Sequence, residues 1–154
     1  MIHLDTLSSL IEDFRLQENE LTRTISLDAE AVIERFNQER EAISTDIRRQ
    51  STGGDSQEGF CVLKPRYQHK PGGTHALNWF RLYKFGKEIR SRQVKKPERG
   101  ADYSESKLAQ MVGEHFAEMV IKVERDLVLL RKANRALVKI RELRRLLGEG
   151  EGTP

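Results

Sequence analysis

The 154-residue chain has a single cysteine, Cys61, and little of the chemistry that marks an enzyme. One cysteine cannot form an internal disulfide or a zinc cluster, and it fits a reducing compartment. The four histidines lack HExxH spacing, and no glycine run matches a phosphate-binding loop. Without a nucleophile motif either, the sequence predicts a protein that is not an enzyme, with no cofactor and no metal.

Long apolar runs are also absent. No stretch approaches the ~20 apolar residues that a membrane span needs, and the N-terminal residues lack the positive start and apolar run of a signal peptide. We therefore expect a cytoplasmic protein without a membrane partner.

Glycine and proline are missing from residues 1–52, where apolar residues recur at steps of three, four and seven. This spacing predicts an acidic N-terminal helix over residues 1–50. The stretch 51–59, rich in glycine and serine, predicts a linker. A second helical stripe predicts one long C-terminal helix over residues 102–147, capped by Asp102, and residues 148–154 are expected to form a disordered tail.

Between the helices, residues 60–99 predict an antiparallel three-strand β-meander. The first strand covers 60–63 and ends near Pro65 as an edge strand, and the others cover 76–85 and 89–94. The expected fold class is α+β: two long antiparallel helices joined by this small meander, in one structural domain. Self-association through the helix stripes, giving a homodimer, is the alternative way to cover the apolar positions.

The positive charge is concentrated in this central segment. Residues 60–99 hold eleven Lys/Arg against two Asp/Glu, a net +9 in a chain of net +3. Because basic side chains neutralise phosphates and aromatic rings stack on bases, we predict a DNA-binding surface here, with duplex DNA as the expected partner. Its candidate residues are Lys64, Arg66, Lys70, Trp79, Arg81, Tyr83, Lys84, Lys87, Arg90, Arg92, Lys95 and Lys96.

Strand alternation places Phe80 and Leu82 toward the helices, with Trp79, Arg81 and Tyr83 facing outward. For Trp79 alone burial is the better expectation, because a lone tryptophan is usually highly buried. If Trp79 and Tyr83 are core residues, the segment grips phosphates without reading bases.

A second basic patch lies on the C-terminal helix, where Arg131, Arg135 and Lys139 are candidates for secondary phosphate contacts. The patch can equally have a structural origin. Cations near a helix C-terminus suit its macrodipole, and basic residues here can also match the acidic first helix across an antiparallel pair.

The series Leu77-Asn78-Trp79-Phe80-Arg81, the basic hairpin around Gly86-Lys87, Tyr103, Glu124 and Leu130-Arg131 resembles the MobI-type proteins of integrative conjugative elements and related plasmids. The resemblance covers roughly residues 76–147. It implies a bacterial, non-catalytic accessory factor that acts at the origin of transfer and helps the relaxase assemble there. The relaxase or another mobilisation protein is then an expected partner.

The order helix, strands, helix is also similar to that of prefoldin subunits, whose helices form a coiled-coil arm. This makes a helical, chaperone-like interaction module the alternative function. The basic central segment argues against it, because strands that assemble an oligomer should be apolar. A large stable oligomer without nucleic-acid affinity would favour this alternative.

Overall fold

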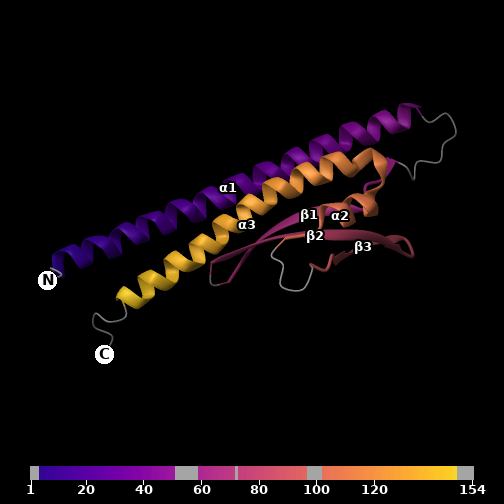
Figure 1. Ribbon diagram of the computed structural model, residues 1–154. Coiled ribbons are helices and arrows are strands. Elements are labelled where there is room, and N and C mark those ends of the chain that lie inside the picture. Colours follow the sequence, from indigo (N-terminus) through magenta and orange to yellow (C-terminus); the bar gives the residue numbers. More distant parts are fainter. Residues whose placement is uncertain (1–3, 51–58, 72, 97–101, 149–154) are drawn as a thin grey trace.

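The computed structural model describes residues 4–50, 59–71, 73–96 and 102–148. Along the chain these ranges form α1 (Leu4–Gln50), β1 (Leu63–Lys70), β2 (Thr74–Phe85), β3 (Glu88–Gln93), α2 (Glu105–Val112) and α3 (Glu114–Gly148) (Figure 1). The fold is α+β, as predicted. Residues 51–58 of the expected linker (51–59), 97–99 of the predicted meander and 149–154 of the expected tail (148–154) lie outside the described residues. Gly148 is the last residue of α3, so it does not belong to a tail.

The two long helices, α1 and α3, lie side by side and run in opposite directions (Figure 1). Ion pairs fix this antiparallel register at both ends. Glu18 of α1 pairs with Arg141 at 3.0 Å and Arg144 at 2.6 Å, whereas Glu39 lies 3.9 Å from Lys122. Part of the basic stripe of α3 therefore matches acidic residues of α1, which was one of the two structural origins considered for that stripe.

The three strands form one antiparallel sheet in the order β1-β2-β3, as predicted. The first strand was misplaced, because it begins at Leu63 and continues through Pro65 to Lys70. Pro65 is tolerated because β1 is an edge strand, where a residue without an N–H need not donate to a second neighbour. Gly86, with a φ of 64°, allows the tight turn from β2 to β3.

The C-terminal helix is not continuous, which corrects the prediction of one long helix over 102–147. Gly113 has a φ of 79° and ends α2, and its N–H donates to the Ala109 carbonyl over 3.2 Å. The N-cap of α2 is Ser104, not Asp102. The chain reverses at Gly113, so that Glu105 at the start of α2 pairs with Arg125 of α3 at 3.0 Å.

The core lies where α1 and α3 cover one face of the sheet. Phe36 of α1 contacts Trp79 of β2 edge to face, with ring centroids 5.7 Å apart. Val120 and Leu127 of α3 are buried in the same cluster, together with Leu77. The buried residues of α1 run only from Ile25 to Ile47, so the sheet is held against the C-terminal half of that helix.

Candidate nucleic-acid interface

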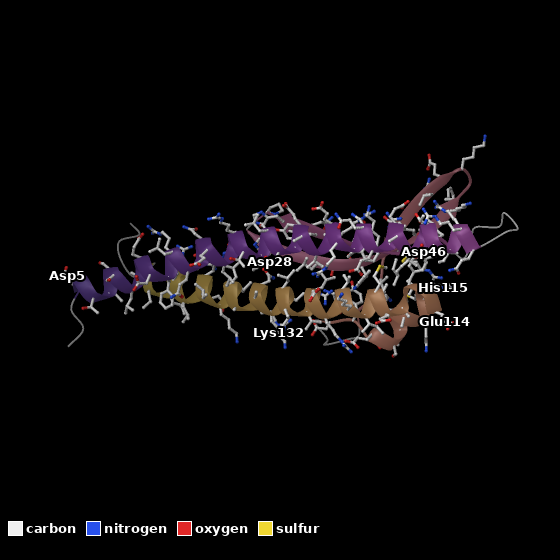
Figure 2. All side chains as sticks on the ribbon, turned by 90° about the horizontal axis from the view of Figure 1, so that it is seen from above. Asp5, Asp28, Asp46, Glu114, His115 and Lys132 are labelled. Atoms are coloured by element: carbon white, nitrogen blue, oxygen red, sulfur yellow. The ribbon has the colours of Figure 1, made fainter. Side chains whose placement is uncertain are left out.

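The β2–β3 end of the sheet diverges from the two long helices (Figure 1) and stands out to one side of them (Figure 2). Trp79 marks the last fully buried residue of β2, and every residue from Tyr83 to Arg90 is exposed. We call residues 81–93 the basic hairpin. It holds five Lys/Arg, at positions 81, 84, 87, 90 and 92, against the single acidic residue Glu88.

The predicted site residues fall into three groups by exposure. Two are buried, Trp79 and Arg131, and two are half-buried, Arg66 and Lys96. The rest are exposed: Lys64, Lys70, Arg81, Tyr83, Lys84, Lys87, Arg90, Arg92, Lys95, Arg135 and Lys139. Lys70 ends β1 at the far end of β2 from the basic hairpin, and Arg135 and Lys139 lie on α3, so these three do not join the hairpin cluster.

Trp79 does not face outward, so the expected aromatic–cation–aromatic row is wrong at its first member. Trp79 points into the core and has no exposed surface. Burial was the better expectation for this residue, because a lone tryptophan is usually highly buried. Arg81 and Tyr83 share its face of β2, but they lie beyond the core, and Tyr83 is 39 % exposed. The outer face instead carries Phe80.

A buried polar network fixes β2 to α3. Glu124, which has no exposed surface, accepts hydrogen bonds from Trp79 Nε1 at 3.0 Å and from the Tyr103 N–H at 3.1 Å. Arg131 donates to both oxygens of that carboxylate at 2.9 Å, and its Nε donates to the Leu77 carbonyl at 2.9 Å. Arg131 is therefore a buried, internal partner of Glu124, which argues against the predicted phosphate contact.

Tyr103 joins this network from the segment before α2. Its hydroxyl accepts a hydrogen bond from the Trp79 N–H at 3.2 Å, and the Arg131 guanidinium lies 5.1 Å from its ring centre. Burial raises the pKa of the Tyr103 hydroxyl. Four of the residues on which the family resemblance rests thus stabilise the fold beneath the basic hairpin: Trp79, Tyr103, Glu124 and Arg131.

Cations of the sheet lie over its aromatic rings. The Arg90 guanidinium is 4.0 Å from the centre of the Phe85 ring, and that of Arg92 is 6.0 Å from the centre of the Tyr83 ring. Because a ring's negative face attracts a cation, these contacts restrict the arginine side chains while leaving their charge at the surface. The hairpin face thereby presents arginines and aromatic rings in pairs.

The two half-buried cations are held more firmly. Arg66 lies 4.4 Å above the Phe80 ring and donates to Ser91 Oγ at 2.8 Å, so it crosses the outer face from β1 to β3. Lys96 lies 5.4 Å from the Tyr103 ring centre. Burial, followed by the charge of Arg131, lowers the pKa of Lys96. Both residues contribute charge to the surface but act partly as structural contacts.

A hydrogen-bonded chain that the sequence did not reveal lies at the other end of the sheet. Ser26 Oγ is 2.8 Å from the Tyr67 hydroxyl, which is 2.6 Å from His75 Nδ1. The His75 ring stacks on that of His69, with ring centroids 4.6 Å apart, and the backbone N–H of His75 donates to Asn134 Oδ1 at 3.1 Å. Burial, helped by the charges of His69 and Arg141, lowers the pKa of His75. Asn134 thus binds a strand backbone from its polar position in the apolar stripe.

The Glu124–Arg131 pair could have been predicted from the sequence. The two residues are seven apart, which is two helical turns, and they fall on the same stripe as Leu127 and Leu130. Opposite charges at that spacing on a buried face indicate an internal ion pair. The partners from the other elements could not be found this way, because no local spacing links Tyr103 to Trp79.

Among the described residues, no group of three or more His, Cys, Asp or Glu side chains could hold a metal ion. The helices in these ranges also include none that is long and apolar enough to cross a membrane. The buried thiol of Cys61 has a pKa raised chiefly by burial.

The chain matches the model of a known protein family. The family model described as MobI protein matches residues 25–145, which is most of the chain and includes the whole scaffold network and the basic hairpin. No curated protein and no solved structure matches the chain. The chain therefore belongs to the MobI family.

Proposed function

We propose that this protein is a non-catalytic DNA-binding accessory factor that acts in the bacterial cytoplasm at the origin of transfer and helps the relaxase to assemble there. Membership of the MobI family implies a role in conjugative mobilisation. Our proposal adds three points to this role: the protein binds DNA, it does so at the origin of transfer, and its partner there is the relaxase.

The observation that carries the proposal is the basic hairpin standing clear of the helices, with Lys84, Lys87 and Arg90 all exposed. A two-stranded β-ribbon of this kind fits the major groove of duplex DNA. Lysines and arginines supply phosphate contacts, and Arg81 is the candidate for a contact to a base edge. Exposed apolar side chains at the tip, Phe85 and Ile89, suit the methyl groups of thymine.

Lys64 and Arg66 extend the positive field along the outer face of β1. Lys95 does so beyond the end of β3. Trp79 supports the hairpin from beneath and contacts no DNA in this proposal. The homodimer through the helix stripes, where Leu4 of α1 and Leu143 of α3 are exposed, remains a prediction.

The direct test measures binding of the purified protein to duplex DNA containing the origin of transfer of its own element, and to a scrambled duplex of equal length. We expect tighter binding to the origin duplex at moderate salt. A second arm measures how long purified relaxase stays on that duplex, which should increase when the protein is present. Absence of binding to either duplex at low salt would exclude the proposal.

The chaperone-like alternative draws support from one feature only, the exposure of Phe85 and Ile89 at 59 % each. Exposed apolar residues at the end of the hairpin could pack against those of other copies and so form an oligomer. Size measurement by light scattering separates the two functions, because a large stable oligomer that binds no DNA would favour the alternative.

A further inference from the structure

An open hollow lies between the basic hairpin and α2, on the same side of the sheet as the core. Its volume is about 600 Å³, within the range of ~300–1,000 Å³ typical of sites for small organic groups. Its lining includes Arg81, Tyr83, Arg92, Val94, Lys95 and Met111. The strands, the segment after β3 and α2 therefore all contribute to it.

The chemistry of this lining is specific. Tyr83 gives a partly exposed aromatic ring, and Val94 and Met111 add apolar surface. Arg81, Arg92 and Lys95 give three positive charges, and none of the described residues that line the hollow is acidic. A flat aromatic surface beside several cations is the combination that binds a single unstacked nucleotide, since the ring stacks on the base and the cations bind its phosphates.

A smaller hollow of about 150 Å³ continues from the first and shares Val94, Lys95 and Met111 with it. It adds the lysines Lys96 and Lys107. The positive surface thus continues beyond the aromatic part of the first hollow.

We propose that the hollow between the basic hairpin and α2 binds an unpaired nucleotide of DNA, with its base stacked on Tyr83 and its phosphates held by Arg81, Arg92 and Lys95. This inference rests on the proposed DNA-binding function and adds to it a preference for locally unpaired DNA. The hairpin tip, at Lys84, Lys87 and Arg90, does not line the hollow. It contacts the paired DNA on either side of the unpaired nucleotide.

The chain offers matched controls. Phe85 is a second exposed aromatic on the same face of β2, and Arg90 is a second arginine of β3 stacked on an aromatic ring. Neither lines the hollow. Tyr83→Ala can therefore be compared with Phe85→Ala, and Arg92→Ala with Arg90→Ala, while Tyr83→Phe keeps the ring.

The experiment compares a fully paired duplex with the same duplex carrying one extra unpaired nucleotide, a fluorescent adenine analogue that is quenched when it stacks. We expect the wild-type protein to bind the bulged duplex more tightly and to quench the analogue. Tyr83→Ala should lose quenching and about tenfold of the affinity for the bulged duplex. Tyr83→Phe should retain both. Phe85→Ala should retain the quenching and lose no more affinity for the bulged duplex than for the paired one, because Phe85 does not line the hollow. Arg92→Ala should lose more affinity for the bulged duplex than Arg90→Ala does.

Equal binding of the two duplexes without quenching would overturn this inference and leave the duplex-binding function intact. Loss of quenching in Phe85→Ala to the same extent as in Tyr83→Ala would also overturn it. Failure to bind either duplex would reject the proposed function itself. Circular dichroism of each variant shows whether it is folded, and Tyr83→Phe gives the comparison if Tyr83→Ala is not.

Discussion

Trp79 Nε1 donates a 3.0 Å hydrogen bond to Glu124 Oε1, and neither side chain has any exposed surface. The same carboxylate forms a two-bond ion pair with Arg131. This arrangement fixes β2 to α3 just before the strand leaves the core, so the direction of the basic hairpin is set by buried residues.

Removing both members of the buried pair should cost much less than the sum of the costs of removing each alone. Glu124→Leu leaves Arg131 with the partly exposed Asp102 as its acidic partner, so we expect a loss of about 3–5 kcal/mol in the free energy of unfolding. Arg131→Met should cost a similar amount, and the double variant much less than the sum. Urea unfolding followed by circular dichroism measures all three, and simple additivity would contradict the coupling.

The break between α2 and α3 depends on Gly113. Its φ of 79° is unfavourable for residues with a Cβ, although no atom lies within 4 Å of the position that a Cβ would take. We expect Gly113→Ala to lose about 1–2 kcal/mol of stability through backbone strain alone. Gly148→Ala is the control, because that glycine also faces open space and has no positive φ. Equal effects of the two substitutions on the urea midpoint would show that the break is not held by Gly113.

Glu18 should make the helix pair sensitive to acid. Partial burial raises the pKa of Glu18, but its hydrogen bonds and charge interactions with Arg144 and Arg141 outweigh this, so the pKa lies below its ordinary value. The ionised Glu18 side chain therefore contributes to the free energy of unfolding above about pH 4.3, the pKa of a glutamate in the unfolded chain. This contribution is lost as the pH falls through the lower pKa of Glu18 in the folded protein. Glu18→Gln should lose about 1 kcal/mol at neutral pH and show a weaker acid dependence.

The control for that substitution is Glu20→Gln, which changes an exposed residue of the same helix. Urea unfolding across an acid pH series measures both variants. An acid dependence as steep in Glu18→Gln as in the wild-type protein would show that the carboxylate contributes nothing to the helix pair.

His75 should affect the stability of the fold in a different pH range. Its pKa is lowered, so the unfolded chain takes up the proton first, and stability should fall as the pH drops below about 6.5 and level off below the folded pKa. His75→Phe keeps a ring for His69 to stack on but removes the titration, so it should flatten this part of the pH profile. His115→Gln, at an exposed position of α3, should leave the profile unchanged. An unchanged profile in His75→Phe would contradict the assignment.

The sequence was informative wherever one periodicity dominated. The stripes of α1 and α3 followed from apolar spacing, and the order of the strands followed from β-prone segments separated by turn residues. The interior break at Gly113 did not, because Leu108, Phe116 and Met119 keep a helical spacing across the glycine. Only the tertiary position of α2 shows that the chain reverses there.

The orientation of β2 was ambiguous for a physical reason. Apolar residues occupy both alternating sets of the strand, Leu77 and Trp79 in one and Phe80 and Leu82 in the other. Choosing the wrong set is equivalent to an error of one residue in register, which turns every side chain of the strand to the opposite face. The buried partners of Trp79 decide between the two sets, and they come from positions that are distant in the sequence.

The measurement that tests DNA binding by the basic hairpin most directly is the salt dependence of affinity for origin duplex. Each phosphate contact contributes about 0.9 to the slope of log K against log salt, so Lys84→Ala combined with Lys87→Ala should reduce the slope by about 2. Arg23→Ala combined with Lys132→Ala removes the same charge from exposed positions on the helices and should leave the slope unchanged. If the hairpin variant keeps the wild-type slope, or the helix variant loses as much, the hairpin is not the DNA-binding surface.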